Sequence, residues 1–322
     1  MDMYVAKSKF HDFAAFWRGS DSKVNFYVSG GVELRFARDM LQSAWFLTKS
    51  ISGDVLDFES EESLVEFATE VILGLSPAGK QNHIEQIKKS RFASGLKNRR
   101  VWRGVSVGGQ GFCVPYPQIE YNDYKVQLRA VRNATELFSE FSDGFRYIEP
   151  NTDNYKAYSN RMRELLILAC TEIEANFTGI LEVNGIAPMR KYYNSGDFAK
   201  LILALHLKDW GTSLNLRVGC GNIYPYRDWE PNKGTQTLEW YEAYNKVKHD
   251  AFDSLSLANF FNVYSAMSAL YILLISQWGV GVFQEAKLHV PFNCVRMPTY
   301  EIDDIPVAID HESGPDYAPL LI

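Results

Sequence analysis

Apolar residues recur at every third or fourth position in six segments of the chain, which is the spacing produced by one buried face of an α-helix. The predicted helices cover residues 34–47, 64–75, about 155–177, 198–205, 237–252 and 257–278. Ser60 is placed to cap the second of these helices, because Glu61 and Glu62 would then lie at its positive end. The longest helices lie beyond residue 133, so the second half of the chain is predicted to be a helical bundle.

Two stretches of the first half have the pattern of strands instead. Valines in a glycine-rich context favour a strand over 101–107, and apolar residues alternate with polar ones over 126–130. The predicted fold class is therefore α+β. Residues 1–130 are expected to form a mixed region with short strands, residues 131–290 a mainly α-helical bundle, and residues 291–322 an acidic tail.

One predicted helix is unusually apolar. No charged residue and no histidine occurs from Ser254 to Gln284, and about 20 such residues are long enough to cross a bilayer. Asn262, Ser268 and Gln277 interrupt this stretch, and an isolated helix would expose them to lipid. We therefore expect the central, buried helix of a bundle rather than a membrane span.

Composition and charge narrow the class of protein. The chain of 322 residues is 46% hydrophobic and 22% charged, which is typical of a globular protein and excludes a disordered or collagen-like chain. The net charge is -6, but it is uneven, since residues 86–119 hold no acid and six acids follow Arg296 without any lysine or arginine. Four scattered cysteines indicate reduced thiols, not a zinc site or a disulfide framework. Together with an N-terminus that lacks a signal-peptide pattern, this predicts a cytoplasmic protein.

The candidate catalytic residues lie in the predicted helix over 237–252. At 3.6 residues per turn, Tyr241, Asn245, Lys248 and His249 share one face with Phe252. Histidine exchanges a proton near neutral pH, lysine neutralises phosphate charge, and the asparagine amide can donate to a phosphate oxygen. These groups suffice for phosphodiester cleavage without a metal or another cofactor, in which a ribose hydroxyl attacks the adjacent phosphorus.

The order of these segments resembles the HEPN family over about residues 155–278. The resemblance rests on the helix that begins Arg161-Met-Arg163, the motif Tyr244-Asn-Lys-Val-Lys-His249, and the apolar helix that follows. The family motif is an arginine, usually followed by a polar residue, with four to six residues between the arginine and a histidine. Asn245 and His249 match the polar position and the histidine, whereas Tyr244 stands where the family has arginine.

The resemblance implies a helical bundle, often dimeric, of a kind that includes ribonucleases of toxin–antitoxin and phage-defence systems. His249 would be the general acid/base, Asn245 would position phosphate, and Lys248 would stabilise the developing charge, with no metal. Because Tyr244 replaces the arginine of the family motif, its positive charge would come from another residue. Lys248 is the first candidate and Lys246 a less favourable one, and Arg161 or Arg163 could supply the cation from a facing helix. The alternative is a catalytically inactive bundle that binds another subunit of a defence or restriction system.

Further residues are predicted to assist the same function. The basic segment is expected to contact RNA through Lys97, Arg99, Arg100, Trp102 and Arg103. The alternative for this segment is a solvated helix face that leads into an edge strand. Around the catalytic histidine, the predicted supporting residues are Tyr241, Tyr244 and Glu172. The expected partners are RNA, a second copy of the chain and a protein encoded in the same operon, with no membrane.

Overall fold

Contacts between residues divide the chain into two units in this computed structural model. The structure describes residues 3–8, 13–18, 24–29, 47–49, 84–92, 96–103, 105–107, 110–112, 121–215, 219–250, 252–304, 316–317 and 320. A strand-rich unit comprises Met1–Lys97, Arg103–Ile119 and Thr299–Ala318. A helical unit comprises Asn98–Trp102, Glu120–Pro298 and Pro319–Ile322.

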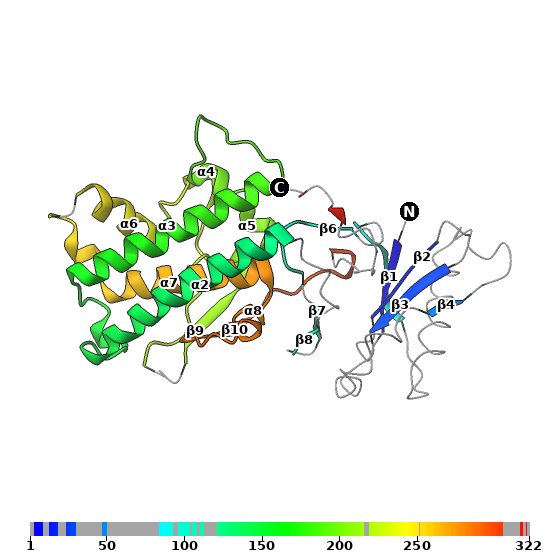
Figure 1. The fold of residues 1–322 in the computed structure, drawn as a ribbon, viewed down its shortest axis with the longest axis horizontal. Coiled ribbons are helices and arrows are strands. Elements are labelled where there is room, and N and C mark those ends of the chain that lie inside the picture. The colour runs from blue at the N-terminus through cyan, green and yellow to red at the C-terminus, as the bar shows by residue number, and fades with distance from the viewer. Residues whose placement is uncertain are drawn as a thin grey trace. The chain divides into compact units, whose positions relative to one another are not determined.

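The strand-rich unit is built on one antiparallel sheet with the strand order β4-β3-β2-β1-β5 (Figure 1). The strands are β1 (Met3–Ser8), β2 (Phe13–Arg18), β3 (Val24–Ser29), β4 (Leu47–Lys49) and β5 (Ile84–Lys89). Aromatic and β-branched residues are frequent in β2 and β3, as expected of strands. In β1, Val5 is fully buried.

The described residues of this unit also form two smaller strand pairs. Strand β7 (Val105–Val107) pairs antiparallel with β8 (Gln110–Phe112), in the glycine-rich stretch where a strand is predicted. Strand β6 (Leu96–Lys97) pairs in parallel with β11 (Asp316–Tyr317). Because β11 and the 3-10 helix η7 (Ile302–Asp304) come from the predicted acidic tail, part of that tail is folded into this unit.

The helical unit is a bundle of four longer helices (Figure 1). These are α2 (Tyr121–Asp143), α3 (Asn160–Val183), α6 (Glu239–His249) and α7 (Phe260–Trp278). Helix α7 packs against the other three, and α3 also packs against α2 and α6. Short helices α4 (Ser195–Phe198), α5 (Leu201–Ala204) and α8 (Val282–Glu285) and the pair β9 (Gly211–Leu214) and β10 (Phe292–Arg296) surround the bundle.

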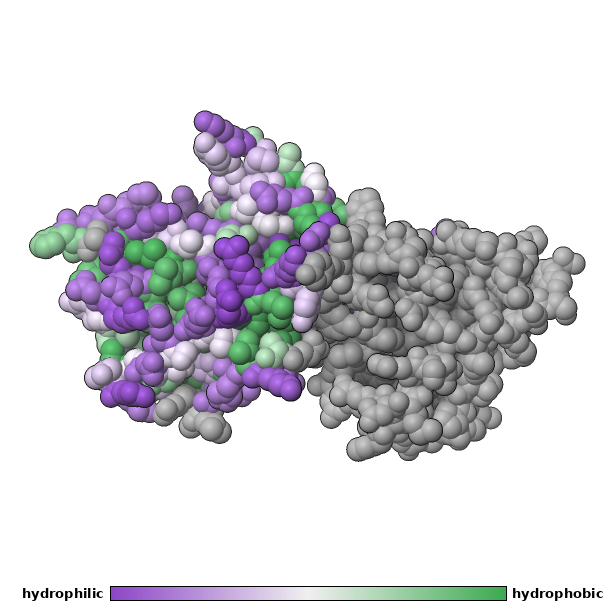
Figure 2. Space-filling model, viewed as in Figure 1, coloured by the Kyte–Doolittle hydropathy of each residue, from purple (hydrophilic) through white to green (hydrophobic). Residues whose placement is uncertain are grey.

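Helix α7 is the core of this unit. All of its residues except Phe261 are buried. It is the only helix in the described part of the chain with the length and hydropathy of a membrane span, and 94% of its most apolar window is buried inside the protein. Two of the polar residues that interrupt it form hydrogen bonds there: the Gln277 side-chain amide donates to the Leu273 carbonyl oxygen at 2.9 Å, and that of Asn262 donates to the Leu257 carbonyl oxygen at 2.8 Å. The buried Ser268 hydroxyl has no hydrogen-bond partner among the described residues. On the drawn face of the unit, hydrophilic residues surround smaller hydrophobic areas (Figure 2).

Caps explain where the two longest bundle helices predicted from sequence begin. The Ser159 hydroxyl accepts a hydrogen bond from the Met162 backbone N–H, which starts α3 at Asn160 rather than at 155. The Asn259 side chain accepts from the Asn262 backbone N–H in the same way at the start of α7. The single helix predicted over 198–205 is instead divided into α4 and α5.

The strand predicted over 126–130 is wrong. This stretch lies within α2, and Val126 and Leu128 of the expected buried strand face are exposed. The alternation of apolar and polar residues there is also compatible with a helix whose buried side carries Ala130, Val131 and Ala134. The predicted domain boundary at residue 131 therefore falls inside a helix.

The helix predicted over 64–75 lies outside the described residues, as does that over 34–47 except for Leu47, which begins β4.

Candidate functional site

The C-terminal end of α6 presents the three predicted catalytic side chains to solvent. Asn245, Lys248 and His249 are all exposed. Their spacing of three and four residues places them on one side of the helix. Acidic residues in the first turn of α6 and basic residues in its last turn complement the helix dipole, so this basic end also favours the helix itself.

Tyr244, at the position of the family's arginine, is fully buried and faces α3. Its hydroxyl accepts a hydrogen bond from the Lys248 ammonium at 2.7 Å and donates to the Glu174 carboxylate at 3.4 Å. The Tyr241 hydroxyl donates to the other oxygen of Glu174. We call Glu174, Tyr241, Tyr244 and Lys248 the Tyr–Glu–Lys cluster.

The electrostatics of this cluster keep its lysine charged and its tyrosines neutral. Burial raises the pKa of Tyr241, and the nearby Glu174 carboxylate raises it further. Burial also raises the pKa of Tyr244, against the opposing effect of the hydrogen bond from Lys248. That hydrogen bond raises the pKa of the Lys248 ammonium. Near neutral pH, Lys248 is therefore a cation at the surface, beside Asn245 and His249.

Arginine also reaches this end of α6, from helix α3. The Arg163 Nε donates a hydrogen bond to the Val247 carbonyl oxygen at 3.1 Å, two residues before His249. The last carbonyl groups of a helix carry a partial negative charge, and a guanidinium bound to one of them offsets it. Arg161, the other arginine considered from the sequence, instead pairs with Glu140 and Glu164 on the surface.

The predicted supporting residues have different locations. Tyr241 and Tyr244 belong to the Tyr–Glu–Lys cluster, but both are buried and therefore do not contribute to the exposed face. Glu172 accepts a hydrogen bond from the Asn133 side-chain amide of α2 at 3.4 Å, so its partner in the structure is on α2 and not on α6. Glu174, which was not predicted as a supporting residue, is the α3 carboxylate that contacts α6, through Tyr241 and Tyr244.

The predicted RNA-binding segment over 97–103 does not form one exposed surface. Lys97 and Arg103 belong to the strand-rich unit, whereas residues 98–102 belong to the helical unit. Arg99 forms a two-point contact with Asp123 at 2.7 and 3.2 Å. Trp102 is buried, its ring centroid 6.0 Å from that of Trp210. These placements correct the expectation that this whole segment faces RNA.

Arg100, which was predicted to contact RNA, is buried in the helical unit. Its side chain is buried between α3 and α7, where its guanidinium donates to Gln277 Oε1 at 2.7 and 3.1 Å and to Asn176 Oδ1 at 3.3 Å. It also lies over the Trp278 ring, 5.2 Å from the centroid. Within the described residues no carboxylate forms an ion pair with it, and burial lowers the pKa of Arg100 to about 10. Arg100 is thus part of the bundle core.

The packing of Arg100 makes Gly179 of α3 sensitive to substitution. A Cβ at position 179 would lie 2.4 Å from Arg100 Nη1, and the guanidinium cannot move away without losing its hydrogen bonds. We expect Gly179→Ala to lower the free energy of unfolding by about 1–3 kcal/mol, although helix propensity alone would predict a gain. Denaturant unfolding measures this. Gly144→Ala, where nothing lies within 4 Å, is the control, and equal effects of the two changes would contradict the packing of Arg100.

Comparison of the chain with models of protein families, with curated proteins and with solved structures finds no match. Among the described residues, no group of three or more histidine, cysteine, aspartate or glutamate side chains is arranged to hold a metal ion.

Proposed function

We propose that the helical unit cleaves RNA without a metal at the exposed end of α6. Neutral His249 takes the proton of a ribose 2′-hydroxyl, whose oxygen attacks the adjacent phosphorus. The bond from that oxygen to phosphorus forms while the bond from phosphorus to the 5′-oxygen breaks, and water protonates the departing 5′-oxygen. The products are a 2′,3′-cyclic phosphate and a 5′-hydroxyl end.

The observation that carries this proposal is that Asn245, Lys248 and His249 are exposed together on one side of a helix end. In this proposal Asn245 donates to a phosphate oxygen, and the Lys248 ammonium stabilises the charge that develops on phosphorus. The Tyr244 hydroxyl occupies one of the three donors of that ammonium, which leaves its others for phosphate. Arg163 adds a positive charge at the same helix end.

Tyr244 favours a second candidate function, a catalytically inactive bundle that binds a partner protein. A buried phenol that is bonded to Glu174 and Lys248 cannot replace the exposed cation that the family motif places there. The two functions differ in one property. A ribonuclease cleaves single-stranded RNA in the presence of EDTA, whereas the inactive bundle leaves the same RNA intact.

Two lysines of α6 provide a matched test of the proposed role of Lys248. We expect Lys248→Ala to reduce RNA cleavage in EDTA by roughly 100-fold, because one donor to the developing charge is lost. Lys246→Ala is the control, since Lys246 pairs with Glu242 at 2.9 Å and a change there is expected to leave the rate within about twofold. Initial rates on a labelled single-stranded RNA measure both, and equal losses would exclude a special role for Lys248.

A further inference from the structure

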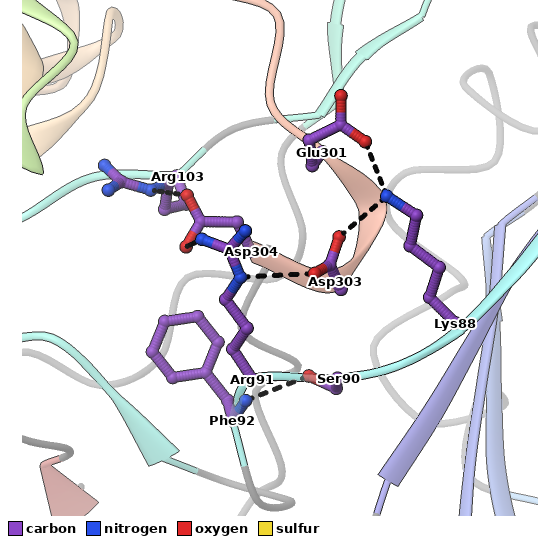
Figure 3. Close-up of polar contacts among 8 residues, drawn as sticks. All are labelled: Lys88, Ser90, Arg91, Phe92, Arg103, Glu301, Asp303 and Asp304. Carbon is purple, nitrogen blue, oxygen red and sulfur yellow. Dashed lines mark hydrogen bonds and ion pairs between the residues drawn. The ribbon is translucent and has the colours of Figure 1, made fainter. Parts of the chain in front are cut away.

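In the strand-rich unit, three acidic residues of the predicted tail cover three cations (Figure 3). We call Glu301, Asp303 and Asp304 the acidic strap; the last two lie in η7. We call Lys88, Arg91 and Arg103 the cation row. Two members of the cation row come from β5 and the residues just after it, and the third lies just before β7. All six residues belong to one unit although more than 190 positions separate the strap from the row.

The acidic strap and the cation row form a chain of ion pairs in which carboxylates and cations alternate. Lys88 Nζ lies 2.7 Å from Glu301 Oε2 and 3.3 Å from Asp303 Oδ1. Arg91 Nε lies 3.1 Å from the other oxygen of Asp303, and its Nη1 lies 3.8 Å from Asp304. Arg103 Nε lies 2.9 Å from the second oxygen of Asp304. Each carboxylate thus contacts at least one cation, and both aspartates bridge two.

Other contacts hold the strap in place. The Arg91 backbone N–H donates to the Asp303 carbonyl oxygen at 2.9 Å, and the Ile302 side chain is buried. The Arg103 guanidinium lies over the ring of Tyr300, which precedes the strap, at 5.2 Å from its centroid. Coverage is uneven, because the side chain of Arg103 is only 6% exposed whereas that of Arg91 remains 53% exposed.

The cation row would be a strongly positive surface without the strap. Its three residues come from the stretch over 86–119 that contains no acid, so the neutralising charges come from the distant tail. Like charges that converge on one short segment repel each other and attract a polyanion. Guanidinium and ammonium groups bind phosphate oxygens with the same hydrogen-bond geometry that they use for carboxylates.

We propose that the cation row is a binding site for the phosphate backbone of single-stranded RNA, and that the acidic strap competes with RNA for it. The strap carboxylates then occupy the positions that phosphates take in the complex. This site goes beyond the proposed function, because it uses no residue of α6 and requires no cleavage. It also gives the folded part of the acidic tail a regulatory role, since the strap sets how much RNA this unit binds.

The test measures affinity for a labelled single-stranded RNA in full-length protein that carries His249→Ala, so that cleavage does not interfere. We expect Asp303→Asn with Asp304→Asn to raise the affinity on the order of tenfold at low salt. The slope of log affinity against log salt should become steeper by about 1.4, which corresponds to roughly two additional phosphate contacts on a single strand. Fluorescence anisotropy over a range of salt concentrations gives both quantities.

The matched control is Glu140→Gln with Glu164→Gln, which changes the net charge equally and frees Arg161 in the helical unit. The proposal is overturned if the two double variants bind RNA with the same affinity and salt slope.

If circular dichroism shows that the strap variant has unfolded, Glu301→Gln replaces it, because Glu301 is 63% exposed and pairs with Lys88. A gain in RNA affinity over Glu230→Gln, which frees Lys233, supports the proposal, and no gain over that control refutes it.

Discussion

Replacing His249 with alanine is expected to lower the rate of RNA cleavage in EDTA by at least roughly 100-fold. His249 is the exposed histidine at the end of α6, histidine is a common general acid or base in catalysis, and general acid–base catalysis typically contributes about 10²–10⁴-fold. The affinity for RNA should change little, since binding in this account depends on Lys248 and the cation row. The rate is measured on a labelled single-stranded RNA, and the affinity by anisotropy at the same salt concentration.

His289 provides the control for this change. It is an exposed histidine of the same unit, in the loop after α8, and it has no role in the proposed chemistry. His289→Ala is therefore expected to cleave RNA as the unchanged protein does. Because His249 is exposed, its removal should also leave the far-ultraviolet circular dichroism spectrum and the melting temperature unchanged. Full activity in the His249→Ala protein would remove the assignment of the site.

Replacing Arg100 with alanine is expected to lower the free energy of unfolding by about 2 kcal/mol. The change leaves the buried Gln277 Oε1 without its two donors, at a cost of about 1–3 kcal/mol, and opens a cavity beside Gly179. Asn176 Oδ1 loses one donor but keeps the Gln277 amide at 3.4 Å. Loss of the desolvated positive charge offsets part of this cost, since burial lowers the pKa of Arg100 to about 10 and so disfavours its charged form. Chemical denaturation monitored by circular dichroism gives the net value.

Two further substitutions separate the effect of the cavity from the effects of the lost charge and hydrogen bonds. Arg100→Met fills most of the volume without a charge, so it should be less destabilising than Arg100→Ala if the cavity contributes. Arg146→Ala removes an arginine whose side chain is 78% exposed, and its surface pair with Asp143 contributes at most about 1 kcal/mol. Equal stability of the Arg100→Ala and Arg146→Ala proteins would show that Arg100 is not a core residue.

Three of the four bundle helices were predictable because their signals are local, whereas α2 was not predicted. Apolar periodicity placed α3, α6 and α7, and α7 is buried, as its polar interruptions predicted. The exposure of Asn245, Lys248 and His249 agrees with their common helix face. These properties depend on residues within one or two helical turns, which is the range that a sequence pattern reports.

The basic segment was not predictable in the same way, because its partners are far away in the sequence. Arg100 and Gln277 are 177 positions apart, and Arg103 and Asp304 are 201 positions apart. A run of cations without nearby acids therefore suggested a solvated or RNA-binding surface. The carboxylates and amides that receive these cations come from η7, α2, α3 and α7, and only the tertiary fold identifies them.

Two residues of α3 that contact α6 were underestimated although a signal for them existed. Arg163, Cys170 and Glu174 lie on one face of α3 at the spacing expected of a buried helix face, together with Ile167. Only Glu172 was predicted to support the site. A search for charged residues in register with Cys170, which is fully buried, would have favoured Glu174 and Arg163.

The most direct test of the central claim is the chemical nature of the RNA ends that the purified full-length protein produces in EDTA. The account predicts fragments with 2′,3′-cyclic phosphate and 5′-hydroxyl ends, and no cleavage of an RNA in which every ribose 2′-hydroxyl is replaced by hydrogen. Intact RNA, fragments with 3′-hydroxyl ends, or cleavage of the deoxy substrate would contradict it.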